Sequence, residues 1–156
     1  MTNKPATAID VLPFWARMNG QLIQLVDYIP DDKMNWSPKP ELWNFRGILI
    51  HFSMARHNWL GNQIRDGEPS PDVLREGQTK DQLKDQLAVS WQRLERFLSD
   101  PAKMSASYDG MYYDKPTTFT ADWLSYHLLE HDVHHRADLF TYLSLLGVEH
   151  PNVETP

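Results

Sequence analysis

Hydrophobic residues recur along this chain at intervals of three and four, the spacing that predicts amphipathic α-helices. Four segments show this period, at about 10–28, 45–65, 80–98 and 121–146. The apolar stripe of the first comprises Leu12, Trp15, Met18, Leu22, Leu25 and Val26. The stripe of the second comprises Ile48, His51, Phe52, Ala55 and Trp59. Four helices of bundle-spanning length predict an all-α four-helix bundle with long connecting loops.

Residues that favour helix starts stand at the beginnings of these segments. Asp10, Asn44 and Thr120 are candidate N-caps, and Thr79 followed by Gln82 matches a capping box. The first three have side-chain oxygens that can accept from first-turn amides, and the box satisfies two amides at once. The helix starts are therefore predicted from chemistry as well as from the period.

The connections are irregular in sequence. Residues 36–40 and 66–71 are punctuated by proline, which disfavours helix and strand interiors. Residues 99–119 lack the helical period, although 108–112 are compatible with a small turn or hairpin.

Composition and charge limit the partners and the metal ligands that this chain can have. With 156 residues and 41% hydrophobic content, the chain is expected to form one domain over residues 1–156. The formal net charge is −6 and the basic residues are scattered, so no nucleic-acid partner is expected. No membrane-length apolar run and no apolar leader are present, so we expect a cytoplasmic protein without a membrane partner. The chain has no cysteine, which leaves His, Asp and Glu as metal ligands.

Four of the seven histidines lie between positions 126 and 136. His131 and His135 are four residues apart and therefore share a helix face. At ~100° per residue, with His131 at zero, His135 falls at ~40°, inside the apolar stripe. His127 and His134 fall at about −40° and −60°, and we interpret them as second-shell or rim residues. His131 and His135 are therefore the predicted inward pair.

His51 is the histidine on the apolar stripe of the second segment. A single inward histidine is more often a satisfied core residue than a ligand, but three inward imidazoles would need partners side by side. A metal ion bound by His51, His131 and His135 satisfies all three. Three imidazoles leave one position open for water or substrate, as in catalytic zinc sites.

Nearby polar residues are assigned by the same helical angles. Asp138, at about −20°, is a candidate catalytic residue that could orient a ligand or accept a proton. Asp132 and Glu130 lie ~100° from His131 and are expected to be solvated charges. His57 points roughly 120° from the stripe of its helix and is expected at the surface or rim.

Aromatic residues in the connections have two possible roles. Trp36, Trp43, Tyr112 and Tyr113 could line a pocket mouth, and core packing is the expected role of each.

The residues resemble a known family. The segment 131–136, followed by 143–151, resembles the C-terminal signature of the DinB/YfiT-like proteins, which are bacterial four-helix bundles. Residues 48–51 and 57–60 resemble the second helix of the same family, and the similarity runs from about Leu12 to Pro151.

This resemblance implies that the family's metal triad falls on His51, His131 and His135. It also implies a divalent metal, zinc or nickel, and a homodimer. Related members transfer low-molecular-weight thiols such as bacillithiol to electrophiles, or isomerise maleylpyruvate with a thiol cofactor. Where the family often has Arg-Gly-Gln, this chain has Arg136-Ala137-Asp138, which leaves the three ligand positions intact.

Two classes of function follow. The first is a metal-dependent enzyme acting on a small-molecule substrate, a small-thiol transferase or else a hydrolase. The second is a non-catalytic stress-response bundle in which the metal serves stability or sensing. His131-Asp132-x-x-His135 also resembles the zincin motif with Asp in place of Glu, but Asp is one methylene shorter, so a peptidase is disfavoured.

Overall fold

The computed structural model describes residues 8–69, 71 and 77–150. The side chain of Leu12 and the residue Pro151, both used in the sequence analysis, lie outside this description. In the part that is described, no helix combines the length and apolar character needed to cross a membrane.

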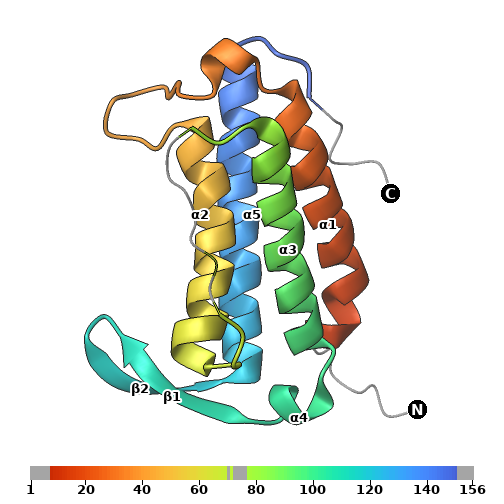
Figure 1. Ribbon diagram of the computed structural model, residues 1–156, viewed down its shortest axis with the longest axis vertical. Coiled ribbons are helices and arrows are strands. Elements are labelled where there is room, and N and C mark those ends of the chain that lie inside the picture. The colour runs from red at the N-terminus through yellow and green to blue at the C-terminus, as the bar shows by residue number, and fades with distance from the viewer. Residues whose placement is uncertain (1–7, 70, 72–76, 151–156) are drawn as a thin grey trace.

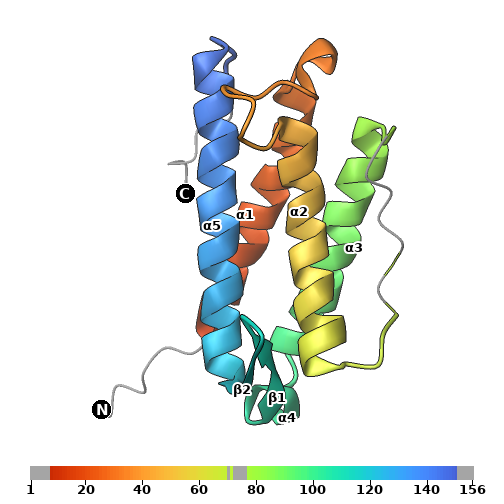
Figure 2. The ribbon, with the colours of Figure 1, turned by 90° about the vertical axis from the view of Figure 1, so that its left-hand side faces the viewer.

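Four long helices form a bundle: α1 (Ala8–Tyr28), α2 (Phe45–Asn58), α3 (Lys80–Leu98) and α5 (Ala121–Leu145). Helices α1 and α5 run in one direction, and α2 and α3 run in the other (Figures 1 and 2). Helix α3 therefore begins at the end of the bundle where α2 begins, and not at the end where α2 finishes (Figure 2). The predicted four-helix bundle is confirmed.

The predicted caps at three helix starts are confirmed. The side chain of Asn44 accepts from the amide of Gly47 at 2.8 Å. Thr79 and Gln82 form a reciprocal capping box, with distances of 2.9 and 3.2 Å between each side-chain oxygen and the other residue's amide nitrogen. Thr120 accepts an amide hydrogen bond at the start of α5. These bonds satisfy amides that a helix start leaves unpaired, which is why the sequence locates these starts well.

Other helix ends differ from the sequence analysis. Helix α1 already begins at Ala8, so the prediction of Asp10 as its N-cap is wrong. The segment expected to be α-helical to residue 65 changes at its end into a π-helical turn, η2 (Trp59–Ile64). Arg65 follows with a left-handed backbone (φ 58°) and ends the helix.

An antiparallel hairpin lies at one end of the bundle. After a single short helix, α4 (Pro101–Met104), strand β1 (Ser107–Tyr112) pairs with strand β2 (Lys115–Thr120). Residues 108–112 are therefore part of a hairpin, one of the two alternatives the sequence allowed. The turn itself is at 113–114, where both residues have positive φ, as a two-residue turn requires.

The hairpin packs against η2, and Gln63 makes a close approach to its first strand. The Oε1 atom of Gln63 accepts from the amide of Met111 at 2.9 Å. A Cβ at Gly110 would lie 2.3 Å from the same Oε1 atom, so only glycine fits there without displacing Gln63. The hairpin thereby covers the end of the bundle where α2 finishes and α5 begins (Figure 1).

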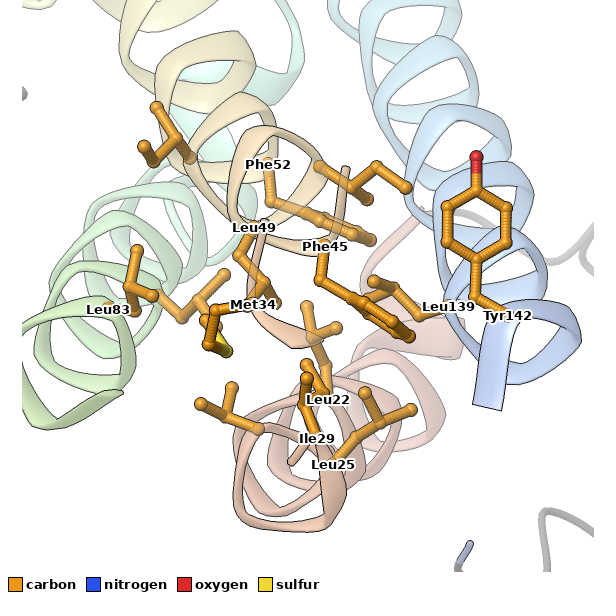
Figure 3. Close-up of a cluster of buried hydrophobic side chains, with 14 of the residues drawn as sticks. Leu22, Leu25, Ile29, Met34, Phe45, Leu49, Phe52, Leu83, Leu139 and Tyr142 are labelled. Atoms are coloured by element: carbon orange, nitrogen blue, oxygen red, sulfur yellow. The ribbon is translucent and has the colours of Figure 1, made fainter. Parts of the chain in front are cut away.

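The core consists of two hydrophobic clusters. The first lies between all four helices at the end where α2 starts (Figure 3). Its buried members include Leu22, Leu25, Ile29, Met34, Phe45, Leu49, Phe52, Leu83, Leu139 and Tyr142. Trp36 packs against this cluster as expected, and it remains partly buried. The second cluster, nearer the hairpin, includes Trp15, Leu60, Trp91, Leu94, Phe97, Leu124 and Leu128.

A polar network fastens the connection after α2 to α3. The guanidinium of Arg93 donates to Asp66 at 2.7 Å and to the carbonyl of Glu68 at 2.7 Å, and it contacts Nδ1 of His57 at 3.1 Å. His57 is only 5% exposed, so its predicted place at the surface or rim is wrong. Helix α2 packs against α3 as well as α5. It therefore buries a second face, which a single apolar stripe does not reveal.

His57 is expected to make the protein less stable in mild acid. Burial, followed by the positive charges of Arg93 and Arg56, lowers the pKa of His57 from 6.5 to about 4. Between these values the unfolded chain binds a proton that the folded chain does not. The free energy of unfolding should therefore fall as the pH drops from about 6.5 towards 4, by at most about 1.4 kcal/mol per pH unit for one histidine.

NMR titration of the His57 ring should find its midpoint near pH 4. Urea unfolding as a function of pH should show a smaller acid loss in a His57→Gln variant than in the unchanged protein. A midpoint for His57 near the ordinary histidine value would contradict this prediction.

Candidate metal centre

Three half-buried imidazoles from helices α2 and α5 converge on one another. His51 lies on α2, and His131 and His135 lie one turn apart on α5. The Nε2 atoms of His51 and His131 are 2.7 Å apart, and one ring nitrogen of each of the three residues lies within 4.8 Å of the others. The structure thus brings together the three histidines that the sequence analysis selected.

The surroundings of His51 and His135 favour the uncharged imidazole, which is the form that can bind a cation. Burial, and then the proximity of His131 and His135, lowers the pKa of His51 from 6.5 to about 4. Burial and His131 likewise lower the pKa of His135, although Asp138 opposes the shift. Imidazoles with low pKa values are neutral at pH 7 and keep a lone pair free for a metal. A set of three imidazole nitrogens fits a divalent transition metal.

Asp138 lies next to His135, three residues further along α5. One carboxylate oxygen is 3.1 Å from Nδ1 of His135 and 3.7 Å from Nε2 of His134. A hydrogen bond at Nδ1 leaves Nε2 of His135 free. His134 is 69% exposed and so lies at the rim, and the three residues His134, His135 and Asp138 form a second group that could hold a metal.

Asp132 is the main correction to the sequence analysis. The prediction of a solvated charge is wrong, because the side chain is 1% exposed. Its Oδ2 atom accepts from Arg56 on α2 and from the indole of Trp15 on α1, each at 2.8 Å. Its Oδ1 atom is 3.7 Å from Nδ1 of His131. Glu130 is exposed, as expected.

Trp43 covers the three-histidine cluster from the loop before α2. Its ring lies 4.2 Å from the His51 ring, edge to face, and stacks on His135 at 5.8 Å and an angle of 15°. The backbone carbonyl of Trp43 accepts from the hydroxyl of Tyr142 at 3.1 Å, which ties the loop to α5. Trp43 is 49% exposed, so the expectation that it packs in the core is wrong.

The remaining aromatic candidates lie near the hairpin. Tyr113 is 81% exposed at the turn, and its expected core role is also wrong. Tyr112 is partly buried against Trp59 and Trp123. His127 stacks on Trp123 at 5.0 Å and lies one turn from His131, outside either group that could hold a metal in the described residues.

A pocket of about 860 Å³ adjoins the cluster. His51 lines it together with Trp43 and the apolar side chains of Leu42, Ile50 and Met54, and Arg46 is among its polar lining residues. One of the three converging imidazoles therefore borders a space that could admit a small molecule. The sequence did not reveal this pocket, because loop and helix residues form it together.

Comparison with known proteins identifies the same architecture. The chain superposes on a DinB-like protein from Bacillus cereus ATCC 10987 with a TM-score of 0.71 and 15% identity, covering 92% of this chain and 95% of the other. It superposes on the DinB-like protein YjoA from Bacillus subtilis with a TM-score of 0.70 and 18% identity, covering 94% and 99%. At these identities the similarity establishes the fold alone.

A search of curated proteins found no match. The sequence profile of the DinB family, in contrast, matches residues 1–156. The three-histidine cluster, the bundle and this match agree with the resemblance found in the sequence. The chain belongs to the DinB family.

Proposed function

We propose that His51, His131 and His135 bind a divalent metal ion, zinc or nickel, and that the protein is an enzyme that transfers a small thiol to an electrophile. The observation that carries the proposal is that three imidazoles converge on one point while His51 also borders a pocket. A bound ion would lower the pKa of a thiol or water, which is the chemistry needed to make a nucleophile near neutral pH.

The pocket supports a small substrate with both apolar and polar parts. Leu42, Ile50 and Met54 offer apolar contacts, and Arg46 contributes a positive charge. In the proposed reaction the thiol loses its proton to solvent and its sulfur bonds to the electrophilic carbon. The leaving group then departs with its electron pair. Trp43 limits access of water from the loop side, because it covers two of the three rings.

Asp138 is proposed to orient His135. An ionised carboxylate can only accept, so a hydrogen bond between Asp138 and Nδ1 would keep the proton on Nδ1 and leave Nε2 as the metal ligand. This contact favours orientation over proton transfer, the other role that the sequence suggested. Asp138 is thus a positioning residue in the proposal.

The pocket also favours an enzyme over a non-catalytic metal protein. A metal held only for stability or sensing predicts a site closed to solvent or completed by a fourth protein ligand. The group of His51, His131 and His135 contains three ligands, and His51 lies at the edge of an open space. An exchangeable fourth ligand is therefore part of the proposal.

The proposal is tested with cobalt-substituted protein and 2-mercaptoethanol. We expect a saturable sulfur-to-cobalt absorption band that is absent from a His51→Ala variant. With 1-chloro-2,4-dinitrobenzene as electrophile, the zinc- or nickel-loaded protein should release chloride as the thioether forms. No spectral change with any tested thiol would overturn the transferase, and cleavage of a p-nitrophenyl ester by the same protein would then favour a hydrolase.

A further inference from the structure

The buried carboxylate of Asp132 lies next to the proposed metal ligand His131. Asp132 follows His131 in the chain, and its side chain is 1% exposed. Its Oδ2 atom accepts from Nη2 of Arg56 and from Nε1 of Trp15, both at 2.8 Å. Guanidinium and indole groups are donors that cannot accept, so the atom at this position must be an acceptor.

The other carboxylate oxygen faces the ligand. Oδ1 of Asp132 and Nδ1 of His131 are both buried, and neither has a hydrogen-bond partner among the residues that the structure describes. The two atoms lie 3.7 Å apart. A small rotation of the imidazole would close this gap to a hydrogen bond. On the opposite side of the same ring, Nε2 of His131 lies 2.7 Å from Nε2 of His51.

We propose that Asp132 is the positioning residue of His131, with Arg56 and Trp15 fixing the carboxylate so that its free oxygen holds the proton on Nδ1 and leaves Nε2 for the metal. The proposal rests on the metal site proposed above. A neutral imidazole has one donor nitrogen and one acceptor nitrogen. An ionised carboxylate can only accept, so the nitrogen that faces it must be the donor.

The neighbouring histidine supports the same assignment. If Nε2 of His131 is an acceptor, the proton between the two Nε2 atoms belongs to His51 in the metal-free protein. The reverse arrangement would place the acceptor nitrogen of His131 against an acceptor oxygen of Asp132 in a buried site. Two facing acceptors without a proton between them are unfavourable.

An Asp132→Asn substitution separates positioning from a structural role. Because Arg56 and Trp15 only donate, the amide oxygen of the asparagine must face them. Its NH₂ group then points at Nδ1 of His131 and favours the opposite tautomer, with the proton on Nε2. The variant keeps the shape and the hydrogen bonds of Asp132 but blocks the metal-binding nitrogen.

The test is a long-range ¹H–¹⁵N NMR spectrum of metal-free protein at about pH 8, above the ordinary histidine pKa. We expect His131 to be protonated on Nδ1 and His51 on Nε2, and the proton of His131 to move to Nε2 in Asp132→Asn. Zinc affinity of this variant should fall ~10–100-fold, as for loss of other outer-shell partners. Asp138→Asn is the matched control and should leave the tautomer of His131 unchanged.

The tautomer of His131 in the unchanged protein tests the role of Asp132 even if the Asp132→Asn variant does not fold. Protonation of His131 on Nε2 in the unchanged protein would overturn the proposal, as would a folded Asp132→Asn variant with the original tautomer. If the unchanged protein binds no zinc, the proposed metal site fails. The tautomers are measured without metal, so they still test the role of Asp132 independently of metal binding.

Discussion

Replacing His51 with alanine is expected to abolish stoichiometric binding of zinc or nickel, and replacing His134 is expected to leave it intact. His51 supplies one of three converging imidazoles. Its loss should therefore reduce affinity by more than the ~10–100-fold that loss of an outer-shell partner costs. Metal analysis of natively purified protein, together with a chelator competition titration, measures the effect.

The two variants also distinguish the two groups that could hold a metal. His135 belongs to both, so His135→Ala should remove the metal in either case. His51 belongs only to the group of three histidines, whose members are all half-buried, and His134 only to the more exposed group with Asp138. Loss of metal in His134→Ala with retention in His51→Ala would place the ion in the exposed group and contradict the proposal.

Neither substitution should unfold the bundle. His51 is partly exposed and is not a member of the hydrophobic clusters that pack the four helices. The far-ultraviolet circular dichroism of His51→Ala should therefore stay close to that of the unchanged protein. This control separates loss of a ligand from loss of the fold.

The second large effect is expected from the ion pair beneath the site. Arg56 and Asp132 are each 1% exposed and 2.8 Å apart. An Arg56→Met substitution leaves the carboxylate buried without its counter-charge, and should lower the free energy of unfolding by about 3–5 kcal/mol. Urea denaturation measures this loss.

Two further variants test whether the loss of stability comes from the buried ion pair. The double variant Arg56→Met/Asp132→Leu removes both charges, and it should recover much of the lost stability, because apolar residues of similar volume often replace a buried ion pair without loss. Arg96→Met breaks the exposed pair with Glu68 and should change the unfolding midpoint little. Equal losses of unfolding free energy in Arg56→Met and Arg96→Met would contradict the prediction that breaking the buried pair costs more than breaking the exposed one.

The charge state of Asp132 sets the pH range in which the pair acts. Burial on its own would raise the pKa of Asp132. The charge of Arg56 and the hydrogen bonds to the carboxylate outweigh burial and lower the pKa below the ordinary 3.8. The stabilising contribution is therefore complete above about pH 3.8 and is lost only as the pH falls through the lower, folded-state value.

The sequence predicts the helices and the three-histidine cluster because both depend on local spacing. The period of three and four fixes the faces of α2 and α5, and Asn44, Thr79 and Thr120 fix where helices start. His131 and His135 share a face through the four-residue repeat alone. His51 follows from its place on the stripe of α2.

Asp132 and His57 show where that reasoning fails. A helical wheel assumes one buried face, but α5 contacts both α1 and α2, and α2 contacts both α3 and α5. Asp132 is buried where Trp15 and Arg56 meet it from two different helices. No spacing within α5 reveals those partners. For Trp43 the sequence suggested the pocket mouth but favoured core packing, because the contact with α5 that places its loop is not visible in the sequence.

The central claim is that three imidazoles from two helices surround one metal ion and leave a position for an exchangeable ligand. X-ray absorption spectroscopy of the zinc-loaded protein, combined with anomalous diffraction from its crystals, tests it most directly. We predict an ion bonded to one nitrogen each of His51, His131 and His135 at about 2.0–2.1 Å, with a fourth ligand from solvent. An ion without a bond to His51, or one enclosed by four protein ligands, would contradict the account.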